Sequence, residues 1–171
     1  MSFKDAVLNG LDEFLQGLKK AVDGLSAEEL RFQASPTSNH ITWLVWHMSR
    51  VEDNWLTRVS GTDSVWDTGG WAEKTGVTGE VYAGGNNKTM EEVSALPDIP
   101  IATLFDYYDA VRARTLGVLD GMTDADMEIG HENPRYGTTT NAWIFGHIIV
   151  EESQHLGQIA FIRGMQRGLG A

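Results

Sequence analysis

The 171-residue sequence contains no cysteine. Disulfide bonds, cysteine-ligated zinc or iron–sulfur clusters and a cysteine nucleophile are therefore excluded. Any thiol that takes part in its chemistry has to come from another molecule. A metal site in this chain has to be built from histidine and carboxylate ligands.

Basic residues are also scarce, because 13 Lys and Arg stand against 24 Asp and Glu, for a formal net charge of −11. Nucleic acids and anionic membrane surfaces bind clusters of basic side chains, so neither is an expected partner. Long hydrophobic runs are absent as well: the longest, residues 41–46, is interrupted by Thr42 and is too short to span a bilayer. The first residues enter an amphipathic pattern rather than a signal peptide, so we expect a cytoplasmic protein.

The sequence does contain apolar residues at helical spacing. The 42% apolar content and the length fit one globular domain, residues 1–171. Steps of three and four predict long helices near 3–23, 40–60, 100–121 and from 139–142 to about 164, and Ser26 predicts a short helix near 27–32. Asn39 is the expected cap of the second long helix. No strand-like alternation occurs, so we predict an all-α four-helix bundle with a long crossover connection between long helices two and three.

Two segments lie outside these helices. Residues 61–98 are rich in glycine, and a connection this long is usually functional or mobile. Its aromatic residues Trp66, Trp71 and Tyr82 favour packing on the body, as a flap or a dimer contact, although a surface loop without chemistry fits equally well. Residues 128–138 are expected to form a polar loop before the last helix.

Ionisable side chains occupy the inward faces of two predicted helices. His147, Glu151 and His155 are each four residues apart, so they share one face of the last helix with several isoleucines. His47 lies on an apolar stripe of an earlier helix. A divalent cation would satisfy these groups together, because two histidines and a glutamate form an open ligand set for catalytic zinc. A hydrogen-bonded core histidine at position 47 and an internal Glu151–His155 ion pair are the alternatives.

Glu152 and His155 also show the Glu-x-x-His spacing of di-iron bundles. The other copy of this spacing, Glu128 to His131, lies in the predicted polar loop rather than on a helix. Glu152 also points about 100° away from Glu151 around the helix. We therefore reject a di-iron site.

The pattern around these residues resembles a known group of proteins. His147-x₃-Glu151-x₃-His155 is followed by Gly-Gln-Ile and an arginine, and Trp-x-x-x-His47 lies on the earlier helix. This pattern is similar to the DinB/YfiT-like superfamily of metal-binding four-helix bundles, over essentially the whole chain. Glu151 at the middle position resembles the branch that contains mycothiol-dependent maleylpyruvate isomerase and related thiol S-transferases. The resemblance implies that His47, Glu151 and His155 are the metal ligands.

The same resemblance implies a metal-dependent thiol S-transferase or isomerase that joins a small-molecule electrophile to a thiol such as mycothiol or bacillithiol. Zinc is the expected ion, although nickel, iron and manganese accept the same ligands. His147 is expected to support the ligands or the substrate, and Arg135 and Tyr136 to bind an anionic substrate or the thiol, unless they merely form a capping loop. A metal-dependent hydrolase on the same site and a non-catalytic, stress-associated metal-binding bundle remain alternatives.

We also expect a homodimer. Three aromatic residues fall partly off the predicted core faces, at Trp46, Phe145 and Phe161. Such residues would form a contact between helix faces of two copies, or would flank a wide core.

Overall fold

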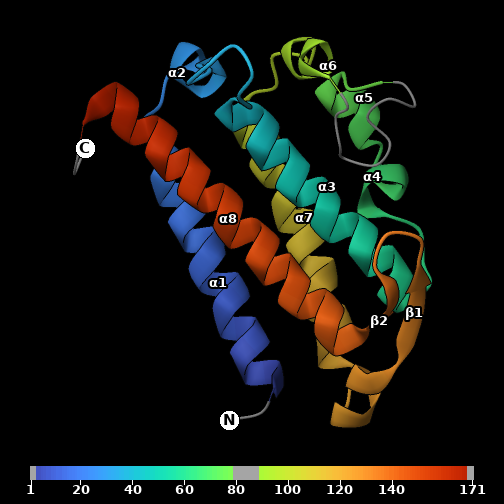
Figure 1. Cartoon of the computed structure of the whole chain (residues 1–171). Helices are drawn as coiled ribbons and strands as arrows, with labels where there is room; N and C mark the ends of the chain where they lie inside the picture. Colours follow the sequence, from blue (N-terminus) through green and yellow to red (C-terminus); the bar gives the residue numbers. More distant parts are fainter. Residues whose placement is uncertain (1–2, 79–88, 169–171) are drawn as a thin grey trace.

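The computed structural model describes residues 3–78 and 89–168, and four long helices form its frame (Figure 1). The prediction of an all-α bundle is confirmed, and the helix boundaries lie within a few residues of the predicted ones. The largest difference is at the last helix, which continues past Gly164. The long helices are α1 (Phe3–Val22), α3 (Ile41–Ser60), α7 (Ile101–Asp120) and α8 (Asn141–Arg167).

Helix α8 packs against both α1 and α3, and α3 packs against α7 (Figure 1). Helices α1 and α8 run in the same direction, because Gly10 faces Ile149 and Gly17, two turns later, faces Leu156. Helices α3 and α7 also run parallel to each other, and antiparallel to α8. The chain therefore has to return along the length of the bundle between α3 and α7, which explains the long connection between them.

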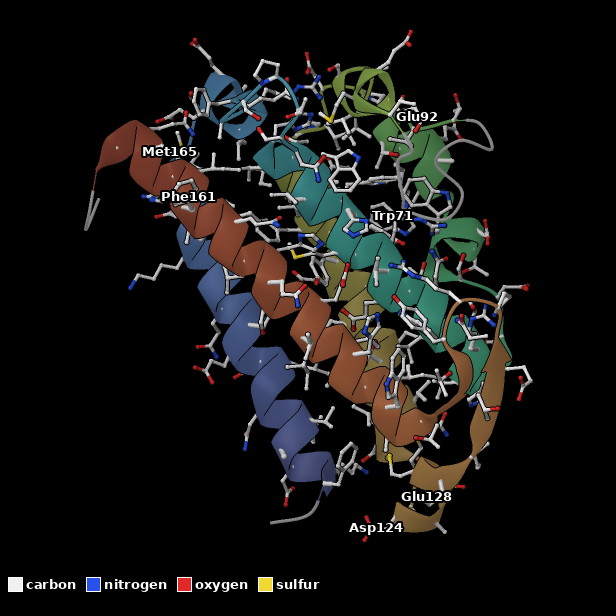
Figure 2. All side chains as sticks on the ribbon, viewed as in Figure 1. Trp71, Glu92, Asp124, Glu128, Phe161 and Met165 are labelled. Atoms are coloured by element: carbon white, nitrogen blue, oxygen red, sulfur yellow. The ribbon has the colours of Figure 1, made fainter. Side chains whose placement is uncertain are left out.

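The core consists of two groups of buried side chains, one toward each end of the bundle. Trp46 and Phe145 belong to these groups and are fully buried, so the expectation that they lie off the core faces is wrong. Each packs against apolar residues of neighbouring elements, which a helical wheel of one isolated helix does not show. Phe161 is 67% exposed (labelled in Figure 2) and keeps the predicted place outside the core.

The connection between α3 and α7 contains the short helices α4 (Val65–Thr68), α5 (Trp71–Thr75) and α6 (Met90–Ser94). Trp66 and Trp71 are buried and pack on the ring of Tyr107 in α7. The prediction that these tryptophans pack on the body is confirmed, whereas Tyr82 lies outside the described residues. The connection is thus anchored by aromatic side chains at its first half.

The segment predicted as a polar loop contains a β-hairpin instead. After α7 come a short 3-10 helix, η2 (Asp124–Glu128), and two antiparallel strands, β1 (Gly130–Asn133) and β2 (Gly137–Thr140). Strands of four polar residues are too short to show alternation in the sequence. The turn forms because the side-chain oxygen of Asn133 accepts hydrogen bonds from the backbone N–H groups of Arg135 and Tyr136.

The starts of two helices test the predicted caps. Ser26 and Glu29 form the predicted capping box at the start of α2 (Ala27–Arg31). Helix α3 is capped by His40 rather than by Asn39, because the His40 ring nitrogen accepts a hydrogen bond from the N–H of Trp43. Within residues 3–78 and 89–168, no helix combines the length and the apolar character needed to cross a membrane.

Candidate metal centre

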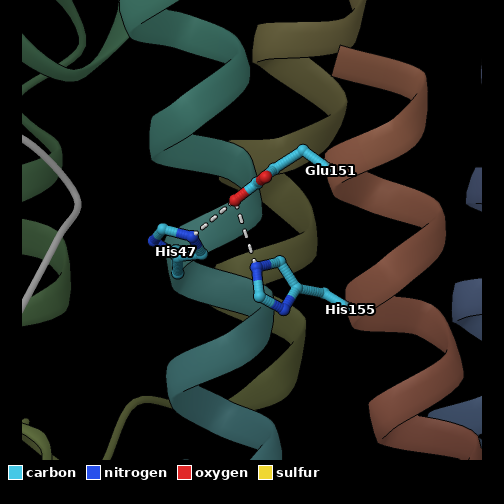
Figure 3. A group of neighbouring side chains, drawn as sticks. All are labelled: His47, Glu151 and His155. Carbon is cyan, nitrogen blue, oxygen red and sulfur yellow. Dashed lines mark hydrogen bonds and ion pairs between the residues drawn. The ribbon is translucent and has the colours of Figure 1, made fainter. Parts of the chain in front are cut away.

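Three side chains from two antiparallel helices meet at one point (Figure 3). Helix α3 contributes His47, and α8 contributes Glu151 and His155 one turn apart. Oε1 of Glu151 lies 3.2 Å from Nε2 of His47 and 3.2 Å from Nε2 of His155. Their ligand atoms all lie within 4.8 Å of one another, and in the described part of the chain this is the one group of three such residues.

The ring of His47 is held by its neighbours. It stacks on the indole of Trp43, one turn earlier on α3, with ring centroids 4.6 Å apart and an angle of 12° between the planes. The edge of the His155 ring lies against it at 4.9 Å. His47 is 5% exposed. The Trp-x-x-x-His spacing in the sequence therefore serves to fix the imidazole plane.

His155 is oriented by the residue one turn after it. Its Nδ1 lies 2.8 Å from the side-chain oxygen of Gln158. Because an amide oxygen only accepts hydrogen bonds, Nδ1 carries the proton and donates it. The lone pair of neutral His155 is then on Nε2, the nitrogen that faces Glu151.

Glu151 and the two histidines stabilise one another's charged forms. The hydrogen bonds from His155 and His47 hold the pKa of Glu151 well below its ordinary value, against the opposing effect of burial. Burial alone would lower the pKa of His155, but the hydrogen bonds with Glu151 and Gln158 outweigh it and raise that pKa. Without a cation, protons on the two imidazoles therefore stabilise the ionised carboxylate of Glu151.

The same donor set fits a divalent cation. Ligand atoms around a tetrahedral zinc ion lie about 3.4 Å apart, given metal–ligand distances of about 2.0–2.2 Å. The 3.2 Å distances from Glu151 to the two histidines match this value. Two imidazole nitrogens and one carboxylate leave a coordination position open. The residues present thus fit a divalent cation with one coordination position left open.

A cavity of about 660 Å³ adjoins Glu151. It lies between the second half of α3, the first half of α8 and the β-hairpin, so residues far apart in the sequence share it. Arg135, Tyr136 and His147, singled out in the sequence, all line this cavity together with Glu151. The complete lining is Val51, Asn54, Trp55, Thr57, Arg58, Asn133, Arg135, Tyr136, His147 and Glu151.

His147 forms part of an aromatic wall in this cavity. Its ring stacks on Trp143 at 4.6 Å, with 15° between the planes, and contacts the rings of Trp55 and Tyr136 at 5.4 Å each. Burial lowers the pKa of His147, and the nearby Arg135 adds to this effect against the attraction of Glu151. The side chain is outside the group formed by His47, Glu151 and His155.

Six of the ten lining residues of the cavity, among them Trp55 and Arg58, carry no functional prediction from the sequence. A signal for Arg58 exists, because positions 47, 51, 54 and 58 follow one another in helical steps of four and three. Arg58 therefore lies on the same stripe of α3 as His47. Its place beside Arg135, however, depends on the hairpin that the sequence did not predict.

Comparisons with known proteins place this fold in a family. A conserved protein from Enterococcus faecalis has a similar structure, with a TM-score of 0.86 and 21% sequence identity over 96% of this chain and 97% of that one. At this identity the likeness shows the fold alone. Among curated proteins no sequence matches the chain. The model of the DinB superfamily matches residues 11–159, a range that includes His47, Glu151 and His155. The chain therefore belongs to the DinB superfamily, whose members often bind metal ions.

Proposed function

We propose that this protein is a metal-dependent thiol S-transferase or isomerase, in which His47, Glu151 and His155 hold a zinc ion and a low-molecular-weight thiol such as mycothiol or bacillithiol is the nucleophile. One observation carries the proposal: Glu151 belongs to the three-residue group and also lines the 660 Å³ cavity. A cation held there would thus face a space of the size that small-molecule sites have.

The bound cation would supply one thing, a lower pKa for the thiol, so that the thiolate forms near neutral pH. The chain has no cysteine, and the nucleophile therefore has to arrive with the cosubstrate. Glu151 and the two histidines would hold the cation and so determine where the thiol can bind. Arg135 and Tyr136, on the hairpin turn, line the same cavity and would contact the substrate or the rest of the thiol.

The test starts with metal analysis of the purified protein, followed by loading with zinc or nickel. Mycothiol, bacillithiol and glutathione are then each offered with the fluorogenic electrophile monochlorobimane. We expect turnover that requires both metal and thiol and that is lost in His47→Ala. Gln154→Ala, on the exposed face of α8, is the matched control and should keep the wild-type rate. A fully loaded wild type with no more activity than His47→Ala would refute the proposal.

One observation favours a second candidate, a metal-dependent hydrolase on the same site. His147 shares the cavity with Glu151, and a neutral imidazole there is suited to accept a proton from water. This candidate predicts ester hydrolysis without any thiol, which His147→Gln abolishes while the bound metal remains. Stoichiometric metal without thiol transfer or hydrolysis would instead support the third alternative, a non-catalytic metal-binding bundle.

A further inference from the structure

Two arginines from different elements lie at the cavity beside Glu151. Arg58 comes from the last turn of α3, and Arg135 comes from the turn of the β-hairpin. Each guanidinium lies over an aromatic ring of the same cavity, Arg58 at 5.8 Å from the centroid of Trp55 and Arg135 at 5.0 Å from that of Tyr136. The fold thus brings two cations to the rim of one pocket.

Among the described residues these two arginines have no carboxylate partner, in contrast to most arginines of the chain. Within the described ranges neither Arg58 nor Arg135 forms an ion pair, and the Arg58 guanidinium donates only to the backbone oxygen of Glu132. The chain carries 24 acidic residues against 13 basic ones, so an arginine without an acidic partner is unexpected. Five other arginines do pair with carboxylates, namely Arg31, Arg50, Arg112, Arg114 and Arg167.

We propose that the cavity binds an organic oxyanion, a carboxylate or a phosphate, carried on a flat unsaturated or aromatic body. The planar, multiply donating guanidinium groups of Arg58 and Arg135 suit an oxyanion. The rings of Trp55, Tyr136 and His147 offer a wall for the flat body. Recognition of the anion by the arginines does not need a metal ion.

The orientation of this ligand rests on the proposed function. With its oxyanion at the arginines, the flat body reaches toward Glu151, where the electrophilic carbon would meet the thiol. The carboxylate of Glu151 lines the same cavity and repels an anion in the absence of a cation. Neutralising Glu151 is therefore expected to strengthen anion binding, whether a cation or a substitution does so.

The test compares three probes by calorimetry on metal-free protein: cinnamate, its neutral amide cinnamamide, and phenyl phosphate. We expect at least one anion to bind about tenfold more tightly than cinnamamide, since hydrogen bonds between charged groups are stronger than those to a neutral amide. Arg58→Gln and Arg135→Gln should each remove about this factor for the anion and leave the amide unchanged. Both arginines are exposed, so the variants should fold. Whichever anion binds more tightly identifies the oxyanion.

Lys20→Gln is the matched control, because it removes one positive charge from an exposed position of α1 outside the cavity. It should bind the anion as the wild type does. Glu151→Gln separates the two proposals, since it should weaken zinc binding and strengthen anion binding. Anion binding that survives without any zinc binding would overturn the proposed function alone. Equal affinities for the amide and both anions, or no effect of either arginine substitution, would overturn the inference about the ligand.

Discussion

Gln158 decides which nitrogen of His155 is available to a cation. Its side-chain oxygen lies 2.8 Å from Nδ1, so the proton stays on Nδ1 and the lone pair on Nε2. Gln158→Leu removes this hydrogen bond and leaves the ligand itself in place. Loss of a partner that orients a metal-bound histidine typically costs about 10–100-fold in metal affinity. We expect a decrease of this size in zinc affinity.

Competition with a chromophoric chelator measures this affinity. Gln154→Leu is the control, because Gln154 lies one turn before Gln158 on α8, is exposed, and forms no hydrogen bond with the three candidate ligands among the described residues. Equal zinc affinities for Gln158→Leu and the wild type would show that Gln158 does not orient the ring.

His40 makes the stability depend on pH. Burial and the charge of Arg31 lower its pKa from 6.5 to about 4. Between these values the unfolded chain takes up a proton that the folded protein excludes, so the free energy of unfolding falls as the pH falls through this window. The expected loss from this group is about 2 kcal/mol between pH 7 and pH 5.

Urea unfolding of the wild type and His40→Asn at both pH values tests this effect. Asparagine caps helices well and does not titrate, so it can replace His40 as the acceptor for the Trp43 N–H. The decrease between pH 7 and pH 5 should be smaller in the variant by about 2 kcal/mol. An identical decrease in both proteins would assign the pH dependence to other groups.

At the scale of elements, Asp53 of α3 anchors the connection that crosses the bundle. Its fully buried carboxylate accepts hydrogen bonds of 2.9 Å from the backbone N–H groups of Val65 and Trp66, at the start of α4. Arg114 and Tyr107 of α7 donate to the same carboxylate. One side chain thus joins α3, α4 and α7.

Asp53→Asn keeps the size of the side chain and removes its charge. Bonds to a charged acceptor are worth about 1.5–3 kcal/mol, so exchange of the Val65 and Trp66 amides should accelerate about tenfold or more. Hydrogen-exchange mass spectrometry measures this, with α1 as the internal reference. Asp63→Asn, an exposed aspartate of the same connection, should leave the exchange unchanged. Uniform acceleration over all helices would point to global destabilisation instead of a local anchor.

The elements that could be predicted are those whose signal lies within one segment. Each long helix shows its own apolar stripe, and Glu151 and His155 are related by one helical turn, so the bundle and the core of the site could be predicted. The strands Gly130–Asn133 and Gly137–Thr140 are polar and short, and the turn between them is stabilised by hydrogen bonds to the side chain of Asn133. The hairpin forms one side of the cavity. Because the sequence does not predict the hairpin, it also does not predict that Arg58 and Arg135 line the same cavity.

For the whole molecule, Arg112 connects all four long helices. It lies on α7 and is 5% exposed. Its guanidinium donates to the backbone oxygen of Leu11 in α1, to Glu52 in α3 and to Glu152 in α8. Burial and the nearby Glu52 raise the pKa of Glu152 well above its ordinary value. A proton on Glu152 then leaves one carboxylate opposite one guanidinium at the centre of the bundle.

This distribution of charge predicts a large loss of stability for one substitution and a small loss for another. Arg112→Met leaves Glu52 buried without its counter-ion and should lower the free energy of unfolding by about 3–5 kcal/mol. Glu152→Gln resembles the protonated acid and should cost less than about 1 kcal/mol, because the amide oxygen still accepts from Arg112 and Tyr108 and the amide N–H can replace the hydrogen bond between Glu152 and Glu52. Urea unfolding at pH 7 measures both changes.

The exposed ion pair between Lys19 of α1 and Asp109 of α7 provides the control. It also joins two helices, but an exposed pair contributes at most about 1 kcal/mol, so Lys19→Met should be nearly neutral. If Glu152→Gln destabilises the protein as much as Arg112→Met, Glu152 is ionised and the central cluster carries a net negative charge. The predicted order, with only Arg112→Met strongly destabilising, requires the buried proton on Glu152.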